Sequence, residues 1–338
     1  MIYYFSLLIL CITSALLSTL LTKLLIILLP KYGMLDVPSA RRAHKKPTPR
    51  GAGIAFIIIF SLLLPAFEYL MFGKLNQTYI ILEIFLPLSL ISLWDDVSHV
   101  LISIRLLVHV ICSFLAIMWL VHPNALFRFE IPIYLDLVIA AFALLNSINL
   151  YNFLDGIDGI TVSETIHLSL TIIILCFFRY DIIVNADIIL STSTIILGWA
   201  AGFIYFNWQP AKIFLGDSGS ITIGFLIGLC LITMSSSSYE LFIACLIAPL
   251  YYILDGGLTI LIRLYKGEKI WEPHLQHFFQ KSVRNGYSHK EVVKRIVKCN
   301  LLLMVLSINA LYYPLISLMC AFLTVSVTLI RSTYQKTL

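Results

Sequence analysis

The chain has 338 residues, of which 60% are hydrophobic and only 12% are charged, and its formal net charge at pH 7 is +5. An ordinary soluble domain is about one quarter charged, so this composition excludes a soluble globular protein and predicts a membrane protein. The small net charge and the absence of a basic stripe in the sequence argue against nucleic acid as a partner.

Apolar runs follow one another along the chain, and a helix of about 20 apolar residues spans a hydrocarbon core of about 30 Å. We therefore predict an all-α fold, a polytopic transmembrane helix bundle of about 11 spans, with roughly 10 or 12 as near alternatives. The first run lacks a basic segment before it and a cleavage site after it, so we interpret it as a retained span. Residues 1–338 are expected to form a single integral-membrane domain. The runs cover residues 2–29, 51–72, 78–94, 103–122, 132–149, 161–179, 188–206, 220–237, 239–262, 296–312 and 314–331.

The connections between the runs differ in charge. One alternating set contains only Lys74, Arg128 and Arg179 as basic residues. The positive-inside rule places the other, basic set in the cytosol, the N-terminus outside and the C-terminus inside. All polar motifs described below fall in the basic set, so we expect an active site on the cytosolic face. The basic set comprises residues 30–50, 95–102, 150–160, 207–219, 263–295 and the tail from 331.

The third run ends in two adjacent carboxylates, Asp95 and Asp96. Adjacent carboxylates raise each other's pKa, and a helix C-terminus disfavours negative charge, so a cation or a transferable proton is a natural partner for the pair. A solvated helix end is the alternative interpretation. Arg105, in the first turn of the next helix, is placed either to pair with the carboxylates or to contact a phosphate.

The fifth run leads into a dense array of amides and carboxylates, among them Asn149, Asn152, Asp155 and Asp158. Each unpaired polar group near hydrocarbon costs several kcal/mol, so this segment is predicted to line a hydrophilic site. Its donors and acceptors are suited to a base and a ribose. A polar turn that merely caps a helix is the alternative.

In the fourth basic loop, Asp217 lies between Gly216 and Gly219 and directly precedes the eighth run. An Asp that begins a helix combines a ligand for a hard cation with a helix end that attracts phosphate, as a magnesium–diphosphate site requires. A plain helix N-cap is the alternative.

The fifth basic loop contains His274 and His277, which share a helix face if the segment is helical. We find no further zinc ligands nearby, so contact with phosphate is the favoured role. The basic residues of this loop, and Lys45 and Arg50 in the first loop, are equally suited to anionic head groups of membrane lipids.

Two further polar pairs are predicted near the end of the chain. Asp255, in the ninth run, is costly in lipid and is expected to pair with a basic partner such as Arg263. Ser288 lies three residues before Glu291, which is the spacing of a capping box that begins a helix leading into the tenth run.

In this order, the motifs resemble those of the polyprenyl-phosphate N-acetylhexosamine-1-phosphate transferases, the superfamily that includes phospho-MurNAc-pentapeptide translocase. The resemblance covers nearly the whole chain. It implies an enzyme of the bacterial inner membrane that transfers N-acetylhexosamine 1-phosphate from a UDP-sugar to undecaprenyl phosphate and releases UMP. It rests on Asp95-Asp96, Asn149-x-x-Asn152-x-x-Asp155-Gly-x-Asp158-Gly, Phe-Leu-Gly-Asp217-Ser-Gly-Ser and the histidine loop.

The resemblance also implies roles for these residues. Asp217 is the Mg²⁺ ligand, with Mn²⁺ as an alternative ion. Asp95 is the favoured base that deprotonates the prenyl phosphate, with Asp96 beside it, and a covalent aspartyl intermediate is the alternative mechanism. UDP-N-acetylhexosamine, undecaprenyl phosphate and membrane lipids are the expected partners, and a homodimer is left open. The histidines that face the diphosphate are His274 and His277, and the residues that contact the substrates are Asn149, Asn152, Asp155, Asp158, Arg105, Lys45 and Arg50.

The histidine loop departs from the family pattern of adjacent histidines, because two residues separate His274 from His277. This departure and residues 47–53 resemble the branch that begins O-antigen chains of lipopolysaccharide with an N-acetylated deoxyhexosamine. We expect the loop to cover the site and to favour a sugar that lacks a hydroxyl, through an apolar wall that includes Phe278 and Phe279. The loop residues expected to contact the sugar are Trp271, His274, Gln276 and His277.

The main alternative function is a proton- or ion-coupled secondary transporter, since carboxylates inside a membrane protein are also typical of transporters. The acidic residues of a transporter should lie near the middle of its spans. Here most of them lie at helix ends or in loops, which favours the transferase.

Overall fold

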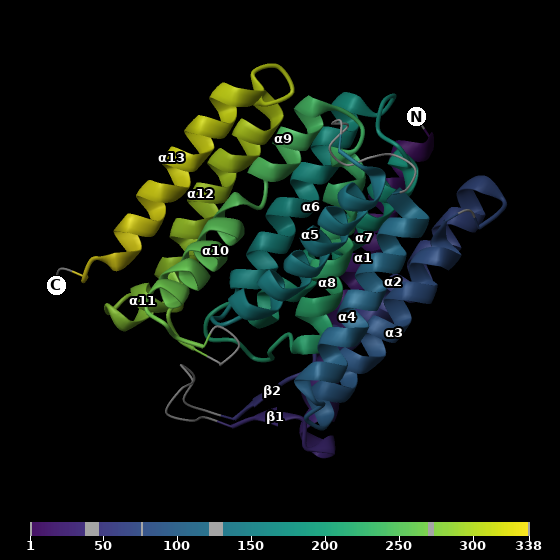
Figure 1. The fold of residues 1–338 in the computed structure, drawn as a ribbon. Helices are drawn as coiled ribbons and strands as arrows, with labels where there is room; N and C mark the ends of the chain where they lie inside the picture. Colours follow the sequence, from purple (N-terminus) through teal and green to yellow (C-terminus); the bar gives the residue numbers. More distant parts are fainter. Residues whose placement is uncertain (1, 38–46, 76, 122–130, 270–273, 337–338) are drawn as a thin grey trace.

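In the computed structural model, the chain forms a helix bundle with a short two-stranded hairpin at one end (Figure 1). The structure describes residues 2–37, 47–75, 77–121, 131–269 and 274–336. The prediction of an all-α polytopic fold is confirmed. The elements in chain order are α1 (Ile2–Leu28), η1 (Leu29–Tyr32), β1 (Leu35–Asp36), β2 (Thr48–Pro49), α2 (Gly53–Phe72), α3 (Thr78–Val97), α4 (Ile102–Ala116), η2 (Ile117–Val121), α5 (Ile133–Leu154), α6 (Ile160–Arg179), α7 (Ala186–Asn207), α8 (Asp217–Ser235), α9 (Tyr239–Ile247), α10 (Leu250–Tyr265), α11 (Phe278–Arg284), α12 (His289–Asn309) and α13 (Pro314–Thr333).

The number of spans differs from the sequence-based prediction. In the described part of the chain, 8 helices are long and apolar enough to cross a membrane, and the bent pair α9–α10 gives a count of up to 9. The predicted run 239–262 is not one straight helix, because α9 and α10 meet at an angle of 67°. The break lies at Pro249, whose ring has no N–H to donate to a helix. Helices α3 and α12, which we predicted as spans, are not among those counted.

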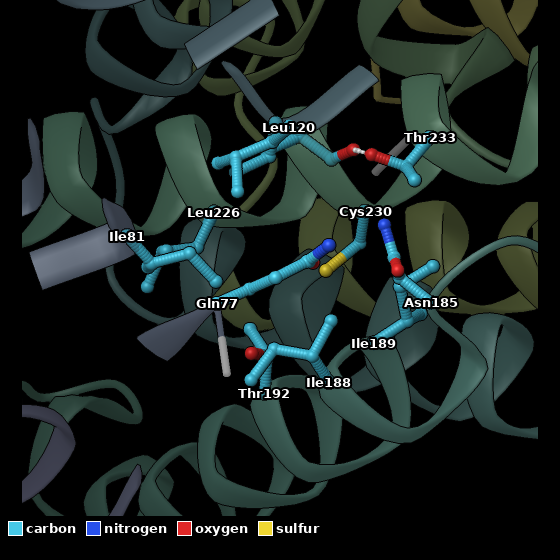
Figure 2. A pocket seen from close by; sticks show the side chains of 11 residues that line it. Gln77, Ile81, Leu120, Asn185, Ile188, Ile189, Thr192, Leu226, Cys230 and Thr233 are labelled. Carbon is cyan, nitrogen blue, oxygen red and sulfur yellow. Dashed lines mark hydrogen bonds between the residues drawn. The ribbon is translucent and has the colours of Figure 1, made fainter. Parts of the chain in front are cut away.

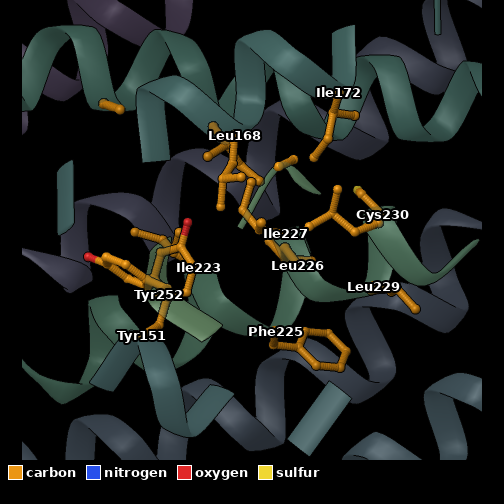
Figure 3. Packing of buried hydrophobic residues seen from close by; sticks show 14 of the residues in the cluster. Tyr151, Leu168, Ile172, Ile223, Phe225, Leu226, Ile227, Leu229, Cys230 and Tyr252 are labelled. Atoms are coloured by element: carbon orange, nitrogen blue, oxygen red, sulfur yellow. The ribbon is translucent and has the colours of Figure 1, made fainter. Parts of the chain in front are cut away.

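The central element of the bundle is α8, in which every residue after Asp217 is buried. A helix that is apolar on all sides belongs inside a bundle. Helices α2, α3 and α5 contact it, and Figure 3 shows Phe225 and Leu226 within this packing. The wholly buried helix therefore holds its first residue, Asp217, in a fixed place at one end of the bundle.

The first basic loop forms the hairpin β1–β2, which pairs Leu35 with Pro49. The end of the hairpin is bonded to the loop that precedes α8. The N–H of Gly51 donates to the carbonyl oxygen of Phe214 at 3.1 Å. The N–H of Phe214 donates to the carbonyl oxygen of Pro49 at 2.8 Å. These bonds fix the backbone on both sides of Arg50.

Glycine lets α2 and α8 begin in direct contact. A Cβ atom at Gly53 would lie 2.1 Å from the backbone nitrogen of Gly219, so neither helix could start here with a larger residue at Gly53. These two glycines therefore serve the close approach of the two helices.

The polar motifs gather at one end of the bundle, near β1, β2 and α11, whereas the N-terminus lies at the opposite end (Figure 1). The C-terminal segment lies at the α11 end, because the N–H of Lys336 donates to the carbonyl oxygen of Asn285 at 3.0 Å. The described members of the basic loop set therefore share one end, as the alternation of loops predicted.

A small cavity lies at the opposite ends of α3 and α8, in the neighbourhood of Gln77, Asn185 and Thr233 (Figure 2). Its volume is about 20 Å³, which is room for about one water molecule. This cavity is too small for a substrate.

Candidate functional site

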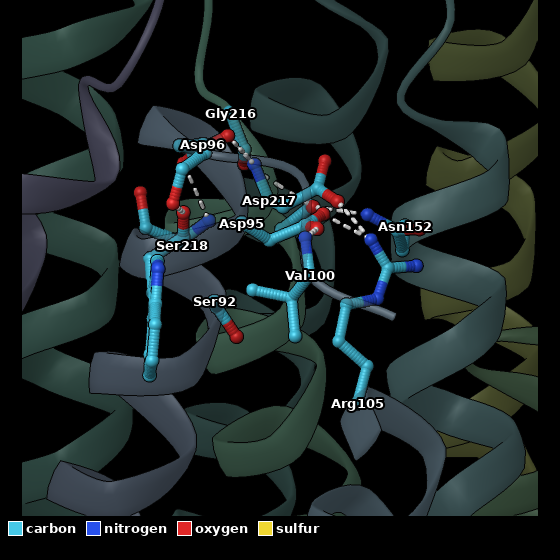
Figure 4. A network of polar contacts seen from close by, with 12 residues as sticks. Ser92, Asp95, Asp96, Val100, Arg105, Asn152, Gly216, Asp217 and Ser218 are labelled. Carbon is cyan, nitrogen blue, oxygen red and sulfur yellow. Dashed lines mark hydrogen bonds and ion pairs between the residues drawn. The ribbon is translucent and has the colours of Figure 1, made fainter. Parts of the chain in front are cut away.

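Three carboxylates and two guanidinium groups form one network at the α11 end of the bundle. Figure 4 shows the three carboxylates with one of the guanidinium groups, that of Arg105. We call Asp95, Asp96, Asp217, Arg50 and Arg105 the carboxylate–guanidinium centre. Arg50 pairs with Asp217 and, through Nε at 3.2 Å, with Asp96. Arg105 pairs with Asp95 and, at 3.0 Å, with Asp217. The structure thus brings together five residues that the sequence placed in four separate segments.

Asp96 occupies the N-terminus of α8. Its Oδ1 accepts from the N–H of Asp217 and its Oδ2 from the N–H of Ser218, both at 2.9 Å. Its side chain is 0% exposed, and Gly216 makes room for it, since a Cβ there would lie 2.7 Å from Asp96 Oδ2. We had expected this helix end to attract phosphate. A protein carboxylate takes that place instead, because it complements the same N–H groups.

A cavity of about 600 Å³ lies beside the centre, a size typical of ligand sites. Of the predicted substrate-binding residues, Arg50, Asn152, Asp155 and Asp158 line it, together with Asp217. Six predicted residues are described but do not line it, namely Asn149, Asp95, Asp96, Arg105, His274 and His277. Lys45 lies outside the described residues.

The donor set at the centre fits a hard divalent cation. Asp95 and Asp217 both contact the same nitrogen of Arg105, Nη1, so their oxygens converge on one point. Mg²⁺ is usually held by one or two carboxylates together with water and substrate phosphates. Among the described residues no group of three His, Cys, Asp or Glu side chains is arranged to hold a metal. Asp217 would therefore hold Mg²⁺ only together with oxygens from a substrate, with the Asp95 carboxylate beside it.

The amide and carboxylate segment, which begins in the last turns of α5 and continues past its end, lines the cavity only in part. Asn152 donates to Ser220 Oγ at 3.2 Å, which ties the end of α5 to the first turn of α8. Gly156 packs against α11, because a Cβ there would lie 3.0 Å from the ring of Phe279. The loop therefore forms the wall between the centre and α11.

A second polar group on the cavity wall consists of Asp158, Asn207 and His289. The N–H of Asp158 donates to His289 Nδ1 at 3.3 Å, and Asp158 Oδ2 accepts from the N–H of Ala211 at 3.1 Å. Asn207 Oδ1 accepts from the N–H of Gly159 at 3.0 Å. These bonds join the loops after α5 and α7 to the start of α12.

The two histidines of the fifth loop are close together, with ring centroids 4.8 Å apart, but they do not share a helix. Helix α11 begins after His277, which is its N-cap. Burial and the neighbouring His277 lower the pKa of His274 to about 4, so His274 is neutral at pH 7. Neither His274 nor His277 lines the cavity, which departs from the expectation that both face a diphosphate.

Asp255 has a basic partner, as predicted, but this partner is His277 and not Arg263. Asp255 Oδ1 lies 3.1 Å from His277 Nδ1 and accepts from the N–H of Phe278 at 2.9 Å. Arg263 instead pairs with Glu268 at 3.0 Å. The N-terminus of α11 offers Asp255 two N–H donors, those of Phe278 and Phe279, and a helix N-terminus stabilises a carboxylate.

Helix α11 supplies cavity residues that the sequence analysis missed. Gln280, Val283 and Arg284 line the cavity, and their spacing of three and four residues puts them on one helix face. The signal was present, but the helix start was not recognised, because His277 is an unusual N-cap residue. Gln276 bonds Glu268 at 2.6 Å, and Trp271 lies outside the described residues. The capping box of Ser288 and Glu291 is confirmed at the start of α12.

The first prediction concerns Asp155, whose pKa is raised by burial from 3.8 to about 6. Because the folded state favours the protonated form, this residue contributes stability at low pH that is lost as pH rises through about 6. Asp155→Asn should therefore raise the melting temperature at pH 8 by about 2–4 °C and leave it unchanged near pH 4. Thermal unfolding in detergent at several pH values measures this, and an equal shift at both pH values would contradict it.

Similarity to known proteins covers the helices that carry the centre. Residues 78–235 match the family described as Glycosyl transferase family 4. The chain is 25% identical over 271 residues to a probable undecaprenyl-phosphate N-acetylglucosaminyl 1-phosphate transferase of Bacillus subtilis, with 77% of this chain and 72% of that protein aligned. It is 27% identical over 309 residues to a phospho-N-acetylmuramoyl-pentapeptide-transferase of Orientia tsutsugamushi, with 79% and 81% aligned. A decaprenyl-phosphate N-acetylglucosaminephosphotransferase of Mycobacterium leprae is 26% identical over 168 residues, 43% of this chain and 41% of that protein.

Proposed function

Because the chain belongs to the polyprenyl-phosphate N-acetylhexosamine-1-phosphate transferase superfamily, we propose that it transfers N-acetylhexosamine 1-phosphate from a UDP-sugar to undecaprenyl phosphate. An oxygen of the acceptor phosphate bonds to the phosphorus that carries the sugar. The bond from that phosphorus to UMP breaks, and UMP leaves. The product is a polyprenyl-diphosphate-linked sugar that begins a cell-surface glycan.

The observation that carries this proposal is the position of the carboxylate–guanidinium centre at the edge of the cavity. Asp217 belongs to both, so a diphosphate in the cavity would reach it and Arg50. Mg²⁺ held by Asp217, with Asp95 beside it, would neutralise charge on that diphosphate. Arg50 and Arg105 add fixed positive charge at the same place.

Asp95 is proposed to act on the acceptor. Asp95 is part of the centre but does not line the cavity. A substrate that approaches along α3 would therefore contact Asp95 before it contacts a nucleotide in the cavity. The phosphate of a lipid at the membrane surface would approach in this way. There the Asp95 carboxylate would take the proton of the acceptor phosphate, and the phosphate oxygen that loses this proton would become the nucleophile.

We place this end of the bundle in the cytosol of a bacterial inner-membrane protein. The support is the excess of basic residues in its loops, which the positive-inside rule assigns to the cytosol. A UDP-sugar is a cytosolic substrate, and undecaprenyl phosphate presents its phosphate at the membrane surface. Both substrates can meet only at such an edge.

The transporter alternative is less well supported by the structure. Transporters of the inverted-repeat type have matched broken helices in two halves, with the site near the middle of the bilayer. In the described part of the chain there is one such bent pair, α9–α10. The carboxylates of the centre lie instead at the end of α3 and the start of α8.

The direct test supplies membranes that contain the protein with radiolabelled UDP-N-acetylhexosamines and undecaprenyl phosphate. The expected result is a labelled lipid and released UMP, both dependent on Mg²⁺ or Mn²⁺. Uptake of label into sealed vesicles without a lipid product would support the transporter and overturn the proposal.

The second prediction concerns the sugar, which we propose is an N-acetylated 6-deoxyhexose, as in O-antigen initiation. The histidines of the loop do not line the cavity, but Leu275 and Val283 do. An apolar wall favours a sugar that lacks a hydroxyl, because no buried polar group is left unpaired.

Val283→Thr adds a hydroxyl without a change in size and should shift the ratio of kcat/KM toward UDP-GlcNAc by about 3- to 10-fold. Val283→Ala, which adds no hydroxyl, is the matched control. A panel of UDP-sugars in one assay measures both. The selectivity proposal is wrong if Val283→Thr and Val283→Ala change the ratio of kcat/KM equally. It is also wrong if Val283→Thr changes only the Mg²⁺ requirement.

A further inference from the structure

A buried carboxylate lies inside the bundle, apart from the carboxylate–guanidinium centre. Glu164 belongs to α6, which is long and apolar enough to cross a membrane, and Glu164 is only 1% exposed. Its Oε2 accepts from Nδ2 of Asn300, in α12, at 2.6 Å. This amide is neutral, and none of the described residues pairs a positive charge with Glu164. The negative charge of the carboxylate is therefore not compensated by the protein, which is costly inside a membrane.

The helix dipole does not compensate this charge either. Helix α6 begins at Ile160, so Glu164 lies in its second turn. The favourable effect of a helix N-terminus on a carboxylate is confined to the first turn. Glu164 therefore needs either a bound cation or a proton.

Several buried oxygen atoms of the same region have no hydrogen-bond partner among the described residues. They are Oε1 of Glu164, Oδ1 of Asn300, Oγ1 of Thr161 and the hydroxyl oxygens of Tyr151 and Tyr252. We call these five residues the Glu164 cluster, and each of them is at most 2% exposed. Buried polar atoms normally have a partner, so this many unpartnered oxygens indicate a bound group.

The Glu164 cluster comes from four helices, α5, α6, α10 and α12, and its side chains converge. Thr161 and Glu164 are three residues apart and share one face of α6. The rings of Tyr151 and Tyr252 are in contact, with centroids 5.5 Å apart (Figure 3). Of the charged groups, the Glu164 carboxylate acts most strongly on both tyrosine hydroxyls. Thr161 is a polar neighbour of the Tyr252 hydroxyl, although no hydrogen bond joins them.

We propose that the Glu164 cluster binds a monovalent cation, Na⁺ or K⁺. Carboxylate, carbonyl and hydroxyl oxygens are the ligands of hard cations, and the Glu164 cluster offers all three kinds. One positive charge neutralises the single carboxylate. A divalent cation would leave a net positive charge buried among apolar helices, which is costly.

The cation site is separate from the proposed transfer reaction and does not depend on it. No member of the Glu164 cluster lines the cavity beside the centre. Helices α5 and α6 flank the loop that contains Asp155. A cation bound between α5, α6, α10 and α12 would hold these helices together, so it should stabilise the folded protein.

The experiment measures the melting temperature of the purified full-length protein in detergent, at fixed pH and ionic strength, as NaCl or KCl replaces choline chloride. Between about 1 and 100 mM of the preferred ion, the melting temperature of the wild type should rise by about 3–6 °C, because a ligand that binds only the folded state stabilises it. Glu164→Gln keeps an oxygen that accepts from Asn300 but carries no charge. Its melting temperature should be the same in all three salts.

Tyr252→Phe removes one oxygen without a change in the ring, so the ion concentration that gives half of the maximal shift should rise by about fivefold or more. This variant decides the matter if Glu164→Gln does not fold. Glu83→Gln is the matched control, because it makes the same chemical change at an exposed position of α3, and it should respond to the ions as the wild type does.

Two results would overturn the inference. Equal melting temperatures of the wild type in NaCl, KCl and choline chloride would show that no alkali cation binds, and would leave a proton as the group that neutralises Glu164. A response to Na⁺ or K⁺ that is unchanged in both Glu164→Gln and Tyr252→Phe would show that the cation binds elsewhere.

Discussion

Asp217→Asn is expected to abolish transfer, with turnover at least about 100-fold below wild type at every Mg²⁺ concentration. Asp217 is the one carboxylate of the centre that also lines the cavity, so no other member of the centre can replace it as a ligand. The variant should stay folded, because Arg50 still pairs with Asp96 and Arg105 with Asp95. Labelled-lipid formation over a Mg²⁺ titration, together with the melting temperature, measures both properties.

The matched control for this variant is Asp181→Asn. Asp181 is exposed and follows the end of α6 that lies away from the cavity, so its loss should affect neither turnover nor metal dependence. Near-normal activity of Asp217→Asn at low Mg²⁺ would show that the metal is held elsewhere. Removal of the metal with a chelator should bring the wild type to the level of the variant.

Asp95→Asn is expected to lower the maximal rate by about 10²- to 10⁴-fold, the usual range for a lost general base. Binding of the UDP-sugar should be retained, since Asp95 does not line the cavity. The local fold should also survive, because an amide oxygen can still accept from the N–H of Val100, which lies 2.9 Å from Asp95 Oδ1. Comparison of kcat with the Kd of UMP separates the two effects.

Glu83→Gln is the control for this variant, since Glu83 is an exposed residue of the same helix, α3. It should leave both the rate and the affinity at wild-type values. A large loss of nucleotide affinity in Asp95→Asn, with little change in maximal rate, would assign Asp95 to the donor substrate instead of the acceptor.

The sequence by itself determined the fold class and the gathering of the polar motifs at one end of the bundle. Both depend on local properties, because the length and apolarity of a run predict a spanning helix. The alternation of basic and non-basic loops then sorts the motifs to one end. The same local information did not reveal the break at Pro249 as a change of direction, since a proline can also lie within a span, as Pro65 does in α2.

Only the tertiary structure decided what each polar residue contacts. Asp96 and Asp217 are 121 residues apart in the chain, and Asp158 and His289 are 131 residues apart. No local spacing relates such residues, and their pairing follows from how α3, α8 and α12 pack. This is why Asp96 could be named as a carboxylate of the site but not as the cap of α8. It is also why His289 and the cavity face of α11 were missed, since a hydrogen bond between distant segments is set by the packed geometry of the helices that carry them.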